Sequence, residues 1–263
     1  SLHDALPISF AYTSLTDLSL PDSVKTLGKN AFGFCTSLST IDLNHVETMG
    51  DYCFQYSNCA EPNFGDSLKS IGASAFIWSA VKTLNLPDSL KSIGDSAFAN
   101  AYSLAEVNIG KSLSNIGTTV FTGSRVLSTI TVDEDNETVD AIDNVLYADN
   151  MTRLVVYAPA KTETEYVAPD TLVSIDAFGI RNATNLESAT FSEGLTTINI
   201  SAFNGCTSLT ELNLPDSVKT VGAFAFCSTN IETLKFGSGL QKIEEHGLSF
   251  IDTKHLVFDG GDD

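Results

Sequence analysis

The feature that most constrains this chain is a unit of 22 or 23 residues that recurs along most of its length. Residues 84–104, L-N-L-P-D-S-L-K-S-I-G-D-S-A-F-A-N-A-Y-S-L, show it clearly. A branched residue that follows the turn of each unit marks the period, at Val24, Val46, Leu68, Leu90, Leu113, Leu172, Leu195, Val218 and Leu240. One such unit cannot bury its apolar face alone, so the period predicts a solenoid of stacked coils.

Each unit divides into short segments with their own local preferences. Apolar and polar residues alternate at residues 84–86, as in a half-buried strand, and Pro87 opens a turn. A second apolar pair follows, and Gly94 permits a tight bend. The segment around Ala97 and Phe98 is then predicted to carry a short helical turn. We expect strands at residues 18–20, 41–43, 84–86, 107–109, 130–132 and 212–214, with the Phe side chains of successive units buried in one column.

The consensus L-x-x-L-x-L-P-D-S-V-x-x-I-G-x-x-A-F-x-x-C resembles the BspA-like leucine-rich repeat family of cell-surface proteins, over residues 15–258. The chain departs from it where Cys53 and Val120 replace Ala, and where Gly110, Ser192 and Gly237 replace the turn Pro. The resemblance implies an α/β solenoid, a right-handed superhelix of about nine to ten coils that is rich in strands and has short helical turns. It also implies a non-catalytic protein-binding or adhesion module of an exported, extracellular or cell-surface protein.

The repeat also sets the expected domain organisation. Residues 1–14 are predicted to be an irregular lead-in, and residues 1–8 match the translation of a common sequencing adapter, so we expect the native amino terminus to be missing. Coils one to five occupy residues 15–132, and coils six to nine with a partial last strand occupy 172–258, ahead of a tail at 259–263. Residues 133–171 are predicted to be a β-hairpin insertion, with strands at 145–147 and 154–157. The whole is expected to be one continuous solenoid domain.

Composition excludes several classes of partner. The formal net charge is −19, with 33 acidic residues against 14 basic ones, which disfavours nucleic acid and anionic membranes. No run of 18 apolar residues occurs, so no membrane insertion is expected within this fragment. We expect a monomer whose partner is a protein or glycan.

No pattern of catalytic or metal-binding residues emerges, and we expect no enzyme activity, cofactor or metal. The cysteines lack C-x-x-C spacing and mostly fill small, buried repeat positions, although a Cys53–Cys59 disulfide stays open as an alternative. The acidic run at residues 133–143 supplies oxygen ligands but lacks the spacing and Gly of an EF-hand loop. Calcium binding there is also left open.

Two surfaces are candidates for partner binding. Phe34, Tyr56 and Trp78 each follow the repeat Phe by two residues, so their rings are expected side by side, at a position where other coils have Gly123, Gly205 or Ser228. The alternative is the exposed sheet face, whose candidate residues are Asp17, Asp42, Asn85, Glu106, Asn108, Glu211 and Asn213. Besides protein binding, the alternatives are a glycan-binding module, which needs aromatic platforms, and an accessory repeat region of a larger surface enzyme.

Overall fold

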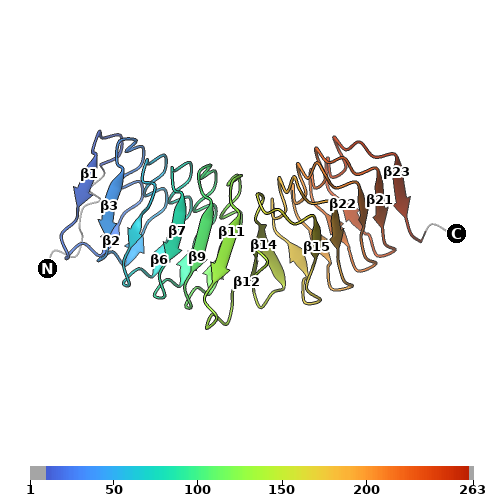
Figure 1. Cartoon of the computed structure of the whole chain (residues 1–263), viewed down its shortest axis with the longest axis horizontal. Helices are drawn as coiled ribbons and strands as arrows, with labels where there is room; N and C mark the ends of the chain where they lie inside the picture. Colours follow the sequence, from blue (N-terminus) through green and yellow to red (C-terminus); the bar gives the residue numbers. More distant parts are fainter. Residues whose placement is uncertain (1–9, 261–263) are drawn as a thin grey trace. The chain divides into compact units, whose positions relative to one another are not determined.

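The computed structural model describes residues 10–260, and the adapter-like residues 1–8 lie outside them. The chain divides into two compact units, with the division between Val139 and Asp140. In each unit the strands of successive coils lie side by side (Figure 1). Each unit is therefore a β-solenoid by itself, and the expectation of one continuous domain stays a prediction.

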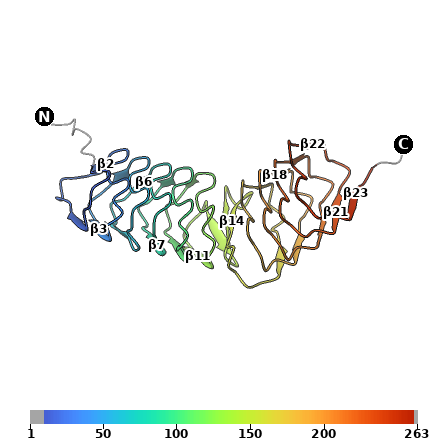
Figure 2. The same cartoon turned by 90° about the horizontal axis from the view of Figure 1, so that it is seen from above.

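The N-terminal unit has two rows of parallel strands, one from the start of each coil and one from after its turn. The first row forms two sheets, β1 (Asp17–Ser19), β3 (Thr40–Leu43) and β5 (Asn63–Phe64), then β7 (Thr83–Leu86), β9 (Glu106–Ile109) and β11 (Thr129–Val132). The second row forms one sheet, of β2 (Thr26–Leu27), β4 (Thr48–Met49), β6 (Ser70–Ile71), β8 (Ser92–Ile93) and β10 (Asn115–Ile116). Figure 2 shows β2 and β6 on the opposite side of this unit from β3, β7 and β11.

The predicted repeat strands are confirmed, each within one residue at either end. Their register joins equivalent repeat positions, with Leu84 opposite Val107 and Asn85 opposite Asn108. Because side chains alternate along a strand, the leucine column points inward and is buried in the inner coils, as at Leu84 and Val107, while the asparagine column points outward.

The core of the N-terminal unit is a column of stacked phenylalanine rings, as expected. Centroids of consecutive rings lie 5.1–5.9 Å apart, and their planes are within 16° of parallel, along Phe10, Phe32, Phe54, Phe76, Phe98 and Phe121. From Phe32 to Phe121 no ring is more than 2% exposed. Each coil therefore buries its ring between those of its two neighbours.

The expected short helical turns are absent, since no helix occurs among residues 10–260. It follows that no helix within these residues is long and apolar enough to cross a membrane. An α-helix needs each N–H to bond four residues back. In the segment around Phe98 every second N–H instead bonds the next coil: Ser96 N to Thr118 O, Phe98 N to Val120 O and Asn100 N to Thr122 O. Ser96 and Asn100 also have positive φ, of 57° each. This bonding between coils replaces the helix, so the fold is a β-solenoid.

The C-terminal unit repeats this architecture with two rows of strands. The row after the turn is a seven-stranded sheet of β12 (Asp140–Ile142), β13 (Val145–Ala148), β14 (Arg153–Tyr157), β16 (Ser174–Ile175), β18 (Thr197–Ile198), β20 (Thr220–Val221) and β22 (Lys242–Ile243). The other row comprises β15 (Glu165–Val167) paired with β17 (Ser188–Thr190), and a sheet of β19 (Glu211–Asn213), β21 (Thr233–Phe236) and β23 (His255–Phe258).

The predicted hairpin exists, because β13 and β14 pair antiparallel, but it does not leave the solenoid. Strand β14 also pairs parallel with β16, with Leu154 opposite Ile175, and β15 pairs parallel with β17. Val145, Tyr147 and Leu154 belong to the buried core of this unit. The interpretation of residues 133–171 as an insertion is therefore wrong from β12 onward, because that part of the segment starts the C-terminal stack.

The coils number about 11, each of about 23 residues, rather than the nine to ten expected. The hairpin segment contributes to the C-terminal stack, as described above. At the other end Phe10 already belongs to a coil, because its N–H donates to Ala31 O at 2.7 Å and its ring stacks on Phe32. The irregular lead-in predicted up to residue 14 is therefore repeat-like from Phe10.

Replacing Phe76 by Ala should lower the free energy of unfolding by about 3–5 kcal/mol, because the ring is fully buried between two others. Urea unfolding followed by circular dichroism measures this. Val126→Ala, at an exposed position of the same unit, should change the value by less than about 0.5 kcal/mol. Equal effects of the two substitutions would contradict the stacked core.

Replacing Leu154 by Ala should lower the free energy of unfolding by about 2–5 kcal/mol, because this side chain is fully buried in the core of the C-terminal unit. Ile142→Ala, at an exposed position of β12, is the matched control and should have little effect. If Leu154→Ala left stability unchanged, the hairpin would be peripheral after all.

Candidate functional site

A row of stacked aromatic rings, here called the aromatic ladder, runs along the N-terminal unit and consists of Tyr12, Phe34, Tyr56 and Trp78. Neighbouring ring centroids lie 4.6, 4.9 and 5.8 Å apart, and the planes differ by no more than 12°. Tyr12 is 76% exposed, Tyr56 40% and Trp78 39%, whereas Phe34 is half-buried. The predicted alignment of Phe34, Tyr56 and Trp78 is present, and Tyr12 extends it by one coil.

The backbone at every ladder position is left-handed, with φ between 54° and 62°. Other coils fill the equivalent position with Gly or Asn in four cases, Asn100, Gly123, Asn182 and Gly205, and with Ser228 and Phe250 in the other two. The left-handed conformation costs most residues roughly 1–2 kcal/mol, and only Gly, Asn and Asp adopt it routinely. The ladder residues therefore occupy a position that suits the repeat better when it holds a small residue.

Beside the ladder lies a shallow groove of about 260 Å³. Its aromatic walls are Tyr56, Trp78 and Tyr102, and the Tyr102 ring stands at 68° to that of Trp78, with the centroids 5.3 Å apart. The remaining lining residues are Ser, Thr, Asn and Ala, so no charged side chain borders the groove. Tyr102 and the groove hydroxyls were not singled out as site residues from the sequence, because only the structure shows that they border one space.

The alternative surface, the sheet face, is largely satisfied by its own hydrogen bonds. Asn108 Nδ2 donates to Asn85 Oδ1 at 2.9 Å and to Glu106 Oε1 at 2.8 Å, and Thr131 Oγ1 donates to Asn108 Oδ1 at 2.6 Å. In the C-terminal unit Asn213 Nδ2 donates to Glu211 Oε1 at 3.0 Å.

The two remaining candidate residues of the sheet face, Asp17 and Asp42, belong to the first strands of the N-terminal unit. Asp17 and Asp42 are exposed on β1 and β3, at different register positions. Among the sheet-face candidates, only Asn85 and Asn108 are therefore joined by a hydrogen bond between strands.

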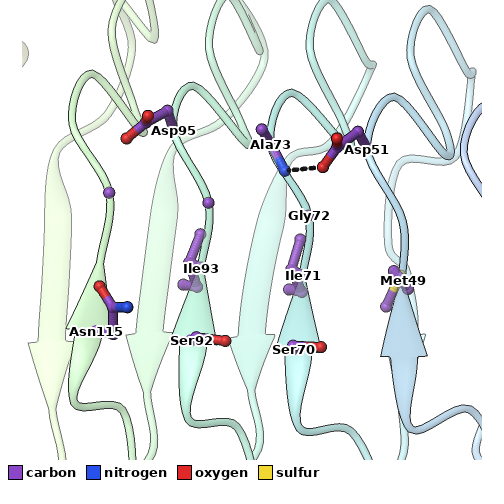
Figure 3. Close-up of a pocket in the computed structure, with 12 residues that line it drawn as sticks. Met49, Asp51, Ser70, Ile71, Gly72, Ala73, Ser92, Ile93, Asp95 and Asn115 are labelled. Carbon is purple, nitrogen blue, oxygen red and sulfur yellow. Dashed lines mark hydrogen bonds between the residues drawn. The ribbon is translucent and has the colours of Figure 1, made fainter.

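Figure 3 shows a second groove, of about 460 Å³, along the short strands of the N-terminal unit. The carboxylates that border it serve the backbone: Asp51 Oδ1 accepts a bond from Ala73 N at 2.9 Å, and Asp95 Oδ1 accepts one from Thr118 N at 2.8 Å. These aspartates tie each coil to the next, which explains why acidic residues recur here without forming a binding site.

The first part of the acidic run 133–143, residues 133–139, is bonded to the last coils of the N-terminal unit. Asn136 Nδ2 donates to Gly110 O and Leu113 O, both at 3.1 Å, while its Oδ1 accepts bonds from Thr138 N and Val139 N. Asp133 Oδ1 accepts a bond from Asp135 N at 2.9 Å. No group of three His, Cys, Asp or Glu side chains within residues 10–260 is arranged to hold a metal ion.

The cysteines are free thiols, and no disulfide joins Cys53 to Cys59. Burial raises the pKa of Cys53 to about 12 and that of Cys59 to about 11. Because the thiolate is the reactive form, both groups are chemically inert at neutral pH.

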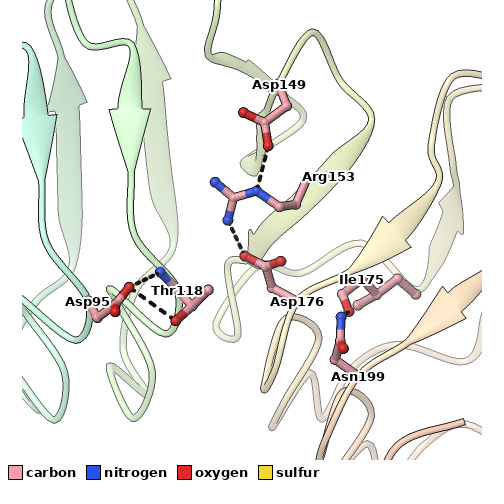
Figure 4. A network of polar contacts seen from close by, with 7 residues as sticks. All are labelled: Asp95, Thr118, Asp149, Arg153, Ile175, Asp176 and Asn199. Carbon is pink, nitrogen blue, oxygen red and sulfur yellow. Dashed lines mark hydrogen bonds and ion pairs between the residues drawn. The ribbon is translucent and has the colours of Figure 1, made fainter.

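Two polar clusters, each with one buried charged residue, Asp176 or Lys161, hold the hairpin in the C-terminal unit. Arg153 Nη1 donates to Asp176 Oδ2 at 2.6 Å, and its Nε donates to Asp149 Oδ2 at 2.9 Å (Figure 4). Lys161 is buried with Nζ donating to Asp143 O at 2.9 Å and lying 4.7 Å from the centre of the Tyr157 ring. These contacts fix the first turns of the unit, and the sequence pattern did not reveal them, since the partners lie 18 and 23 residues apart.

Trp78 fluorescence should be quenched by acrylamide in the folded protein, because 39% of the side chain is exposed. It is the only tryptophan, so the signal has a single source. Quenching should be weaker than after unfolding in urea. If quenching began only on unfolding, Trp78 would be buried and the ladder would not be a surface.

Protonation of Asp176 should couple stability to pH. Burial raises the pKa of this carboxyl to about 6, against the opposing effect of Arg153. Because the folded-state pKa exceeds the unfolded one, the carboxyl's contribution to stability is fully present below about pH 4 and is lost as pH rises through about 6.

The D176N variant isolates this contribution. The free energy of unfolding of the native protein minus that of D176N should decrease from pH 4.5 to pH 7, as measured by urea unfolding. A difference that increases with pH would mean that the ion pair with Arg153 outweighs burial.

Comparison with known proteins agrees with this architecture. The chain resembles the structure of the pneumococcal vaccine antigen PcpA, with a TM-score of 0.84 and 25% identity over 92% of this chain and 62% of that chain. It also resembles leucine-rich repeat proteins of Eubacterium ventriosum (TM-score 0.79, 21% identity, 93% of this chain and 72% of that one) and Faecalibacterium prausnitzii (0.62, 21%, 94% and 80%). The last is described as a leucine-rich cell surface protein.

The chain thus spans less than two thirds of the pneumococcal antigen's structure. A search of curated proteins finds no match to the sequence. The model of the BspA type leucine rich repeat region matches residues 7–128 and 139–257, in six copies. With the stacked coils and phased Leu and Phe columns already described, these matches show that the chain belongs to the BspA-type leucine-rich repeat family.

Proposed function

We propose that this chain is a non-catalytic protein-binding module of an exported cell-surface protein, and that the aromatic ladder contacts the partner. One observation carries the proposal: four large aromatic residues occupy left-handed backbone positions that suit small residues, and three of their side chains are well exposed. Adhesion is the biological role that such a module would serve.

The energetics support a role beyond folding. Holding a bulky residue in the left-handed conformation costs about 1–2 kcal/mol, while an aromatic pair contributes about 0.5–1.5 kcal/mol beyond its buried area. An inner ring makes two such pairs, about 1–3 kcal/mol in total, which largely offsets the backbone cost, and Asn100 or Gly123 satisfies the same backbone in later coils. A contiguous exposed aromatic row is also the kind of apolar surface that soluble proteins use for partners.

Ring geometry favours a protein partner over a glycan. A sugar ring stacks on the face of an aromatic ring, but Phe34 and Tyr56 are each sandwiched between parallel neighbours, so their faces are covered. Between its two ends the ladder therefore offers ring edges and a phenol hydroxyl. Tyr and Trp are enriched at the energetic centres of protein interfaces.

The sheet face is the weaker candidate. Its asparagine and glutamate side chains hydrogen-bond one another, so a partner has to displace those bonds before making its own. The cell-surface location is supported by the family and by the description of the Faecalibacterium relative.

Panning a random peptide library on the full chain tests the proposal. Peptides should be enriched that bind the native protein and bind a Phe34→Asn, Tyr56→Asn double variant at least about tenfold more weakly. Asn suits the left-handed backbone, so the double variant should fold. The matched control is Asp17→Asn, Asp42→Asn, which alters the sheet face and should leave binding unchanged. Enrichment that depends on the sheet face, or no enrichment, would contradict the proposal.

A further inference from the structure

The strand β23 in the C-terminal unit has an open edge with exposed apolar side chains. It pairs with β21 on one side only, and all four of its residues are exposed. Leu256 and Phe258 are 43% and 49% exposed, whereas Leu234 and Phe236, which lie opposite them on β21, are fully buried. An exposed apolar edge strand with unpaired backbone groups is a site at which another strand can add.

The strand β1 in the N-terminal unit has the complementary open edge. It pairs only with β3, which follows it in the chain, just as β23 pairs only with β21, which precedes it. The pairings in this row of longer strands are all parallel. The free edge of β23 in one copy can therefore receive β1 of a second copy in the pairing that the repeat already uses.

The register of the repeat determines which residues meet at such a junction. Each strand of the row lies opposite the next at equivalent repeat positions. Continuing this register brings apolar residues that point inward together, Leu256 with Leu18 and Phe258 with Leu20. Leu18 and Leu20 are themselves only half-buried, so the junction covers apolar surface on both copies.

The aromatic ladder position also continues across the junction. Phe250 and Tyr12 both occupy this position, with φ of 59° and 62°, and their side chains are 75% and 76% exposed. Within the ladder, rings of neighbouring coils stack with their centroids 4.6–5.8 Å apart. The same stacking between Phe250 of one copy and Tyr12 of the next covers two rings that each copy alone leaves in solvent.

Charges at the junction are complementary in both rows of strands. In the row of longer strands the register places His255 opposite Asp17. In the row after the turn, it places Glu245 opposite Lys29, and both of these side chains are exposed. Ion pairs between consecutive coils already occur within the chain, as at His45–Asp22 and Lys254–Glu232, so such pairs suit the stacking of coils.

We propose that copies of this chain associate head to tail, with β1 of one copy added in parallel to the free edge of β23 of another. A second copy is the occupant because it supplies the matching strand, the matching ring and both matching charges. The contact joins two different surfaces, so a pair of copies still has one free edge of each kind and association continues beyond a dimer. This contact is separate from the partner site of the proposed function.

Sedimentation velocity of the full chain at increasing protein concentration tests the proposal. We expect species larger than a dimer to form as the concentration rises. Leu256→Lys should weaken association by about tenfold or more, because it places a charge opposite Leu18. Val126→Lys is the matched control, since it makes the same change of charge at an exposed position outside β1 and β23, and it should leave association unchanged.

Charge reversal tests the head-to-tail register itself. Lys29→Glu should weaken association by about tenfold, and adding Glu245→Lys to the same chain should restore it, because the pair is then reversed and not lost. A chain that stays monomeric, association that stops at a closed dimer, or association that Leu256→Lys or Lys29→Glu leaves intact would overturn the inference. The Phe34→Asn, Tyr56→Asn variant should associate as the native chain does, so failure of the proposed function and failure of this inference are distinguishable.

Discussion

The stacked phenylalanine column is the interaction on which the rest of the structure depends. A single coil of 22 or 23 residues exposes its Phe on both faces, and only the coils before and after can cover it. Because the rings must lie face to face about 5 Å apart, the coils are forced into register. Every other position of the repeat is then aligned as well, including the asparagines of the sheet face and the aromatic ladder.

This alignment explains what the sequence predicts and what it does not. Leu84 and Val107 could be placed on strands because alternation of apolar and polar residues directly reflects burial. The small and apolar residues around Phe98 predict a helical turn, whereas every second N–H there bonds the next coil. Bonds between coils leave no local periodicity in the sequence. The parallel pairing of β14 with β16 was missed for the same reason.

Some features of the candidate site could likewise be predicted from the sequence, and others could not. Phe34, Tyr56 and Trp78 were found because they share one phase of the repeat, and Gly123 and Gly205 at that phase were a signal of the left-handed backbone. The hydrogen bonds from Asn136 to the backbone of the N-terminal unit could not be predicted, because Asn136 lies in an acidic run whose composition suggests a cation-binding site.

The central claim is that the aromatic ladder serves binding and the phenylalanine column serves folding. Replacing Tyr56 by Gly tests it directly, because Gly suits the left-handed backbone while the variant loses both ring stacks. We predict that the free energy of unfolding changes by less than about 1 kcal/mol, since the relief of the left-handed backbone and the loss of ring stacking are similar in size. A loss of about 3 kcal/mol or more, as for a core phenylalanine, would show that the ladder is part of the core and contradict the account.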